Sequence, residues 1–159
     1  METYINKVLG FKFEYPKGWN QEFTGIEIIL FPPDYKKVFI GKNLIPSPAL
    51  SVMVGEEPIQ NPLKYYKEFI SNLSKVFQGY KLIWENPFRL LSGEEALEYS
   101  FEFVKGPQKF QAISITIVKG NMIITLSGSF LNSEVERWKP IIINIIRSLS
   151  LKTGSSLTS

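Results

Sequence analysis

The chain lacks the two residue types that most often carry out catalysis or hold transition metals. Its 159 residues include no histidine and no cysteine. A Ser-His-Asp triad or a Cys-His pair therefore cannot form, and the usual zinc and copper sites lose their main ligands. A Ser–Lys dyad needs neither residue, but no G-x-S-x-G turn is present to expose a nucleophilic serine.

The sequence also gives little support for a phosphate-binding loop or for a metal site built from acidic residues. The sequence contains neither G-x-x-x-x-G-K-[ST] nor G-x-G-x-x-G. Asp34 is the single aspartate, which disfavours Asp-based calcium loops and the usual magnesium–phosphate sites. Adjacent carboxylates occur at Glu56-Glu57 and Glu94-Glu95, where turn positions favour solvated side chains over acid–base catalysis. These observations predict a non-catalytic protein without a cofactor or a bound metal.

A set of polar residues alternates with apolar ones along the strand-like segments 97–103, 110–118 and 122–128. The polar set consists of Glu98, Ser100, Glu102, Ser114, Thr116 and Thr125. Period-two alternation places successive side chains on opposite faces of a sheet. If the strands align these sets, one face is apolar and receives the helices, and the other is a Glu, Ser and Thr surface. That surface is either an ordinary solvated face or the site of a small-ligand-binding or weakly hydrolytic domain.

A second candidate site lies in the segment 34–48, which follows the strand-breaking pair Pro32-Pro33 and contains a short edge strand near residues 38–40. Long connections of this kind either pack as simple links or carry function. Asp34, Tyr35, Lys36 and Lys37 combine charge with an aromatic ring at its start. The prediction is that these four residues contact a protein partner.

The elements that position both candidates are antiparallel strands. Runs at 82–85, 97–103, 110–118 and 122–128 are separated by short turn signals at 92–94, 106–107 and 119–121. Short connections force neighbouring strands to run antiparallel. Earlier strands are predicted at 11–15, 25–31 and 49–54, where apolar residues alternate or cluster between turns.

Two amphipathic helices complete the pattern. The first is predicted to start at Pro62, capped by Asn61, and to end near Gly79. The second follows a capping box at Ser133 and restarts or kinks near Pro140. The predicted fold class is α+β, with an antiparallel sheet of about six strands and two main helices packed on its apolar face. Residues 1–151 are expected to form one domain, followed by a disordered C-terminal tail over 152–159.

Three segments carry a resemblance to a known family. GFKFEYPKGW (residues 10–19) resembles the opening of the PsbP and Mog1 superfamily, with a Phe-rich strand, a Tyr-Pro and a Trp. LSGEEALEY (91–99), WKPIIINIIRSL (138–149) and the long helix after the third strand are similar to later parts of the same pattern. The resemblance implies an antiparallel sheet with packed helices, a binding or assembly role, a protein partner and no cofactor. The chain departs from the exported lipoproteins of that family because it has no lipobox cysteine.

Net charge and hydropathy limit the kinds of partner and the cellular location that the sequence allows. The net charge of +3 comes from 18 basic and 15 acidic residues, and the scattered lysines disfavour a nucleic-acid partner. No stretch approaches the roughly 20 apolar residues that a membrane span needs. No apolar signal-peptide core follows Met1, so a cytoplasmic location is expected if Met1 is the native start, and export if a leader has been removed.

Overall fold

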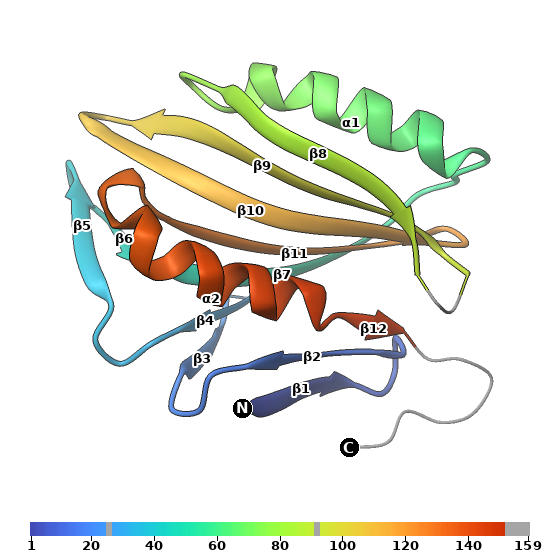
Figure 1. Ribbon diagram of the computed structural model, residues 1–159, viewed down its shortest axis with the longest axis horizontal. Helices are drawn as coiled ribbons and strands as arrows, with labels where there is room; N and C mark the ends of the chain where they lie inside the picture. Colours follow the sequence, from blue (N-terminus) through green and yellow to red (C-terminus); the bar gives the residue numbers. More distant parts are fainter. Residues whose placement is uncertain (25–26, 91–92, 152–159) are drawn as a thin grey trace.

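The computed structural model describes residues 1–24, 27–90 and 93–151 (Figure 1). The predicted disordered tail over 152–159 lies outside these residues. None of the helices in the described ranges is long and apolar enough to cross a membrane.

The central element is a seven-stranded antiparallel sheet with the order β3-β4-β7-β11-β10-β9-β8. Its strands are β3 (Asn20–Phe23), β4 (Ile28–Phe31), β7 (Ala49–Glu56), β8 (Lys81–Arg89), β9 (Glu95–Lys105), β10 (Gln108–Lys119) and β11 (Met122–Leu131). Strands β8 to β11 form the meander that the short turns predict. The α+β class with two main helices is confirmed, although the principal sheet has one strand more than the predicted six.

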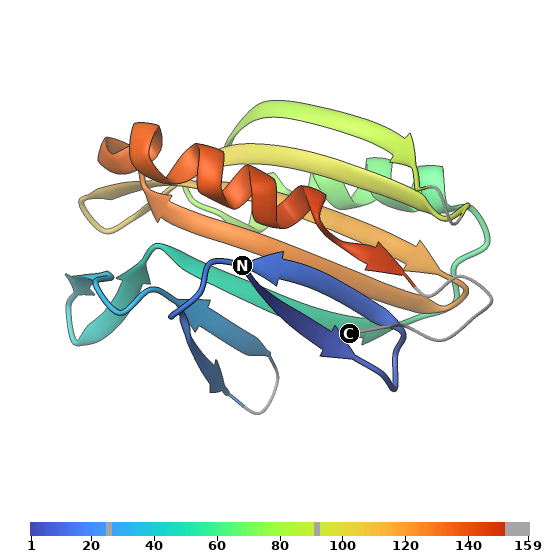
Figure 2. The same ribbon diagram turned by 60° about the horizontal axis from the view of Figure 1, so that its bottom comes forward.

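Two smaller sheets accompany the large one. Strands β1 (Glu2–Asn6), β2 (Phe11–Tyr15) and β12 (Ser150–Leu151) form a three-stranded sheet, with β2 in the middle. Strands β5 (Lys36–Ile40) and β6 (Asn43–Ser47) form a separate antiparallel hairpin, which includes the predicted edge strand. In Figure 2 the small sheet lies on the same side of the large sheet as the C-terminal helix.

Helix α1 (Pro62–Val76) begins as predicted, because the Asn61 side chain accepts a hydrogen bond from the Lys64 backbone amide at 3.2 Å. Helix α2 (Val135–Arg147) follows a 3₁₀ turn over Asn132–Glu134. The predicted capping box is wrong, since Glu134 is the cap residue and makes no capping hydrogen bond through its side chain. Of the two alternatives predicted near Pro140, a restart is wrong, because α2 continues through Pro140 without a break, whereas a kink stays a prediction.

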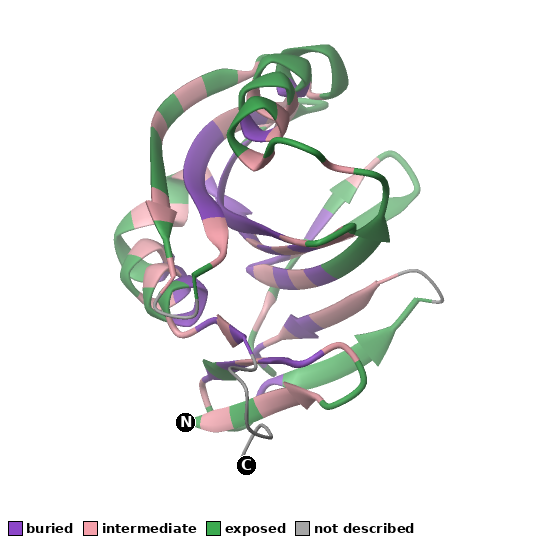
Figure 3. Ribbon diagram, turned by 90° about the vertical axis from the view of Figure 1, so that its right-hand side faces the viewer, coloured by how far each residue is buried: buried purple, intermediate pink, exposed green. Residues whose placement is uncertain are grey.

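The two helices lie on opposite faces of the large sheet, and not on one shared apolar face as predicted. Helix α1 packs over the apolar side chains Leu97, Tyr99, Phe101 and Phe103 of β9. Helix α2 and the small sheet cover the opposite face. That face contributes Ile113, Ile115, Ile117, Ile124 and Leu126. Consecutive residues of β9 and β10 are buried, so both faces of these strands are covered. Figure 3 colours the buried residues purple.

Strand register explains this arrangement. Ile115 of β10 pairs with Glu98 of β9, and Ser114 pairs with Tyr99. Paired residues of antiparallel strands point to the same face. The isoleucines of β10 therefore share a face with Glu98, whereas the aromatic residues of β9 share a face with Ser114.

The GFKFEYPKGW segment packs in the core on the α2 side of the large sheet. Phe11, Phe13 and Tyr15 of β2 are buried in the layer that faces α2. The chain then turns, and the Trp19 ring meets the Trp138 ring of α2 edge-on, with 6.3 Å between centroids. The motif thus joins the N-terminal sheet to the C-terminal helix.

Candidate functional site

The six polar residues of the predicted ligand face are divided between the two faces of the sheet. Ser114, Thr116 and Thr125 lie on the α1 face, because their register partners are residues of that face. Glu98, Ser100 and Glu102 lie on the α2 face. The prediction of one shared polar face is therefore wrong, and its cause is the register described above.

On the α1 face the hydroxyl groups bond to one another. Thr116 Oγ1 lies 3.2 Å from the Tyr99 hydroxyl and 3.1 Å from Thr125 Oγ1, and Ser114 Oγ lies 2.6 Å from Ser127 Oγ. Burial raises the pKa of Tyr99 to about 12. These contacts satisfy buried polar atoms across β9, β10 and β11.

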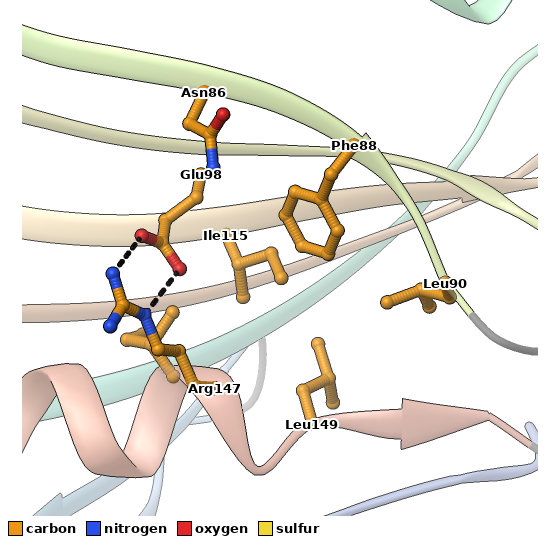
Figure 4. Close-up of a pocket in the computed structure, with 8 residues that line it drawn as sticks. Asn86, Phe88, Leu90, Glu98, Ile115, Arg147 and Leu149 are labelled. Atoms are coloured by element: carbon orange, nitrogen blue, oxygen red, sulfur yellow. Dashed lines mark hydrogen bonds and ion pairs between the residues drawn. The ribbon is translucent and has the colours of Figure 1, made fainter.

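Glu98 lies in a pocket between β8 and the C-terminal end of α2 (Figure 4). The pocket has a volume of about 330 Å³. It is lined by Asn86, Phe88, Leu90, Glu98, Ile115, Ile146, Arg147 and Leu149, which define the Glu98 pocket. Its lining is mainly apolar, with one carboxylate and one guanidinium at the polar end.

The carboxylate of Glu98 is 4% exposed and is held by Arg147. Glu98 Oε1 accepts from Arg147 Nη2 at 3.1 Å, and Oε2 accepts from Nε at 3.3 Å. This hydrogen bonding raises the pKa of the Arg147 guanidinium above its usual value. Arg147 was not predicted as a site residue from the sequence, although a basic residue in the last turn of a helix is also favoured by the helix dipole.

The neighbouring polar residues on the α2 face do not form a catalytic group with Glu98. Ser100 Oγ donates to the Ala112 carbonyl at 2.9 Å and accepts from Gln111 Nε2 at 3.3 Å. Glu102 lies four residues from Glu98 on the same strand, a distance of about 13 Å at the usual rise of a β-strand. Paired carboxylates that act on one glycosidic bond are closer, at about 5–9.5 Å.

The segment predicted to contact a partner forms the base of the β5–β6 hairpin. Asp34 pairs with Arg137 of α2, with 2.8 Å between Oδ2 and Nη2. The Tyr35 ring meets Phe31 edge-on at a centroid distance of 4.8 Å. Lys36 and Lys37 are exposed at the start of β5.

Beyond this base, the tip of the hairpin borders a wide hollow at the C-terminal end of α1. The hollow has a volume of about 680 Å³ and opens beside a second one of about 520 Å³ that shares part of its lining. Its main lining residues are Ile40, Asn43, Leu44, Ile45, Val76 and Phe77, which define the hairpin groove. Val76 is 74% exposed and Leu44 is 44% exposed, so the rim of the groove is apolar and open to solvent.

Phe39 extends this apolar rim onto the hairpin. It pairs directly with Leu44 across the hairpin, so both side chains point to one face, and it is 65% exposed. Lys37 lies on the same face, two residues before Phe39. Phe39, Leu44 and Val76 were not predicted from the sequence as contact residues, because exposed apolar residues have the same local pattern as buried ones.

The described residues offer no obvious metal site. Within 1–24, 27–90 and 93–151, no three or more Asp or Glu side chains are grouped so that they could hold a metal ion. The adjacent carboxylates Glu56 and Glu57 are exposed at the end of β7 and just after it.

Comparison with solved structures finds this fold in proteins of very different sequence. Cyanobacterial PsbP (CyanoP) from Synechocystis has a TM-score of 0.64 and 15% identity, and the match covers 94% of this chain and 91% of that protein. The Ran-binding protein Mog1p from Saccharomyces cerevisiae also has a TM-score of 0.64, with 8% identity, and the match covers 96% and 95% of the two chains. LpqN from Mycobacterium tuberculosis, a protein involved in cell envelope biogenesis, has a TM-score of 0.64 and 12% identity over 89% and 83%.

No protein-family model matches the chain, and no curated protein matches its sequence. The TM-scores of 0.64 establish a common fold, and identities of 8–15% do not transfer a function. The matches nevertheless cover most of the chain in each case, between 89% and 96% of it. The chain has a PsbP/Mog1-like fold, as its GFKFEYPKGW, LSGEEALEY and WKPIIINIIRSL segments predict.

Proposed function

We propose that this chain is a non-catalytic binding domain that recognises a protein partner through the outer face of the β5–β6 hairpin and the adjoining hairpin groove. The observation that carries the proposal is the exposure of Leu44 and Val76 at the rim of one hollow, with Phe39 exposed beside Leu44 on the outer face of the hairpin. Exposed apolar side chains that gather around a concave surface commonly mark protein–protein contacts.

The charges beside the groove indicate the chemistry of the partner. Lys36 and Lys37 are exposed at the base of the hairpin, and Lys105 lines the groove. A partner that inserts an apolar side chain into the groove and carries acidic residues at its edge would complement this surface. In this proposal Lys36 and Lys37 contact the partner, while Asp34 and Tyr35 hold the base of the hairpin against α2 and β4.

The fold comparison supports a binding role of this kind. Mog1p is a Ran-binding protein, so this fold is used for protein recognition in at least one case. The internal polar groups are consistent with a non-catalytic domain. Both oxygens of Glu98 accept hydrogen bonds from Arg147, and the Thr116 hydroxyl is engaged with two neighbouring hydroxyls.

Comparative affinity purification from the native host tests the proposal. The full chain and the variant Phe39→Ser/Leu44→Ser would each be used as bait, and the captured proteins would be quantified by mass spectrometry. We expect one protein to be enriched by the full chain and reduced at least about tenfold with the variant, since loss of central apolar contacts typically costs 2 kcal/mol or more.

Val8→Ser provides the matched control. Val8 is 93% exposed and lies in the turn between β1 and β2. Its replacement by serine therefore also removes an apolar surface group without affecting the core. Its variant should capture the partner as well as the unaltered chain does. Capture of the same proteins in equal amounts by all three baits would contradict the proposal, as would no enrichment over a tag alone.

A further inference from the structure

The Glu98 pocket has the composition of a site for a small amphiphilic molecule. Its volume of about 330 Å³ falls at the lower end of the range usual for small-ligand pockets. Ile115, Ile146 and Leu149 are all at most 6% exposed and belong to the hydrophobic core, yet they still border this space. Glu98 and Arg147 lie together at one end of the pocket, away from Phe88, Leu90 and Leu149 (Figure 4).

Burial of the Glu98 carboxylate costs desolvation free energy, which a purely structural role does not explain. Of the two charged groups only the Glu98 carboxylate is buried, and an ion pair with a buried member is often no more stabilising than apolar side chains of the same volume, because desolvation opposes the attraction. Glu98 lies opposite Ile115 of β10, where an apolar side chain would pack against the same core. Stability alone therefore does not account for the glutamate, and the adjacent hollow suggests that the pair serves a ligand.

The geometry of the pair indicates the charge of that ligand. A guanidinium has five N–H donors, and Glu98 accepts from two of them. The bidentate contact fixes the plane of the guanidinium and leaves three donors for another acceptor. The Arg147 side chain is 62% exposed, so these donors are accessible to a molecule from solvent. A cationic ligand would instead have to displace Arg147 from Glu98.

We propose that the Glu98 pocket binds a small carboxylate with an apolar tail. The tail packs against Phe88, Leu90 and Leu149, above the buried Ile115 and Ile146, and the carboxylate accepts hydrogen bonds from Arg147, as carboxylates do from guanidinium groups in bidentate pairs. Glu98 acts as a positioning residue that orients Arg147. The site is separate from the β5–β6 hairpin, so this inference does not depend on the proposed partner surface.

Titration of the full chain with octanoate, followed by methyl NMR, tests the inference. We expect saturable shifts of the Ile115, Ile146 and Leu149 methyl signals. Octanol and octylamine, which carry the same tail with a neutral or a cationic head, should bind at least about tenfold more weakly. The inference is overturned if these methyl signals do not respond saturably to octanoate, or if octanol or octylamine binds as tightly.

Two arginine variants test the role of the head group. Arg147→Lys keeps the positive charge but loses the bidentate geometry, and should weaken octanoate binding about tenfold. Arg89→Lys is the matched control, because Arg89 is also exposed and pairs with a glutamate, Glu95, outside the pocket. Equal octanoate affinity of Arg147→Lys and the unaltered chain would overturn the assignment. If Arg147→Lys does not fold, the comparison of the three head groups on the unaltered chain decides the question.

Discussion

At the scale of single residues, the Tyr66 hydroxyl joins α1 to two strands of the large sheet. It donates to the Glu95 carbonyl of β9 and accepts from the Val118 backbone amide of β10 at 2.9 Å. Tyr66 is buried, so both backbone groups would be left without these partners if the hydroxyl were removed. The hydroxyl therefore contributes to stability through the groups it satisfies.

Replacement of Tyr66 by phenylalanine should lower the free energy of unfolding by about 2–4 kcal/mol, because the buried Val118 amide loses its partner at about 1–3 kcal/mol and the partly buried Glu95 carbonyl loses a hydrogen bond of about 1 kcal/mol. Urea unfolding followed by circular dichroism measures the change. Tyr65→Phe, one residue earlier in α1, is the control and should change stability by less than about 0.5 kcal/mol. Equal effects of the two variants would show that the Tyr66 hydroxyl has no special role.

The buried tyrosine Tyr99 makes stability sensitive to alkaline pH. Its pKa is about 12 in the folded chain, raised by burial from the usual value of 10. Below pH 10 the tyrosine is protonated in both states and its contribution is complete. Between pH 10 and 12 the unfolded chain releases the proton while the folded chain retains it, so the free energy of unfolding falls by about 1.4 kcal/mol per pH unit from this residue.

Unfolding experiments at several pH values between 8 and 11.5 should therefore show a steeper loss of stability for the unaltered chain than for Tyr99→Phe. Burial also raises the pKa of Tyr66, which acts in the same direction and remains in the variant. The account of Tyr99 would be wrong if the two curves ran parallel over this range.

At the scale of elements, the contact between β11 and α2 depends on a glycine in the middle of the strand. A Cβ atom at Gly128 would lie 2.4 Å from Cγ2 and 2.9 Å from Cδ1 of Ile142. This strand was predicted to end at Gly128, whereas β11 continues to Leu131. Glycine inside a strand often marks a close approach of another element, and here that element is α2.

Gly128→Ala should destabilise the fold by about 1–3 kcal/mol, since the added methyl group forces α2 or Ile142 to move. Thermal or urea unfolding measures the loss. Ile142→Leu removes the Cγ2 methyl and should relieve the clash in part. The double variant is then expected to lose at least about 0.5 kcal/mol less than the sum of the two single variants, and simple additivity would contradict this explanation.

The elements were easier to predict than the way they pair. Period-two patterns identified the strands of the meander, and the Asn61-Pro62 signal identified the start of α1. The same patterns say nothing about register, and a shift of one residue exchanges the two faces of a strand. Glu98 was for this reason assigned to the wrong set of neighbours, and its partner Arg147, 49 residues later, has no local signal.

At the scale of the whole molecule, the two ends of the described chain meet in one small sheet. Strand β2 lies between β1 and β12, and Phe11 pairs with Leu151. The Trp19–Trp138 contact adds a second link between these regions. We propose on this basis that residues 1–151 form a single domain whose N-terminal and C-terminal parts depend on each other.

A pair of shortened chains tests this domain proposal. A chain that ends at Leu151 should unfold at nearly the same temperature as the full chain. A chain that ends at Arg147 lacks the buried residues Leu149 and Leu151, and should lose about 3–6 kcal/mol if each contributes about 1.5–3 kcal/mol by burial. Differential scanning calorimetry measures both, and equal stability of the two shortened chains would contradict the proposal.

The central claim is that the hairpin surface contacts a protein, and site-specific photo-crosslinking in the native host tests it most directly. The crosslinking residue p-benzoylphenylalanine would replace Phe39 in one chain and Val8 in another; both positions are largely exposed, but only Phe39 lies on the hairpin. The account predicts a discrete covalent adduct with one other protein from position 39 and none from position 8. No adduct from position 39, or the same adducts from both positions, would contradict it.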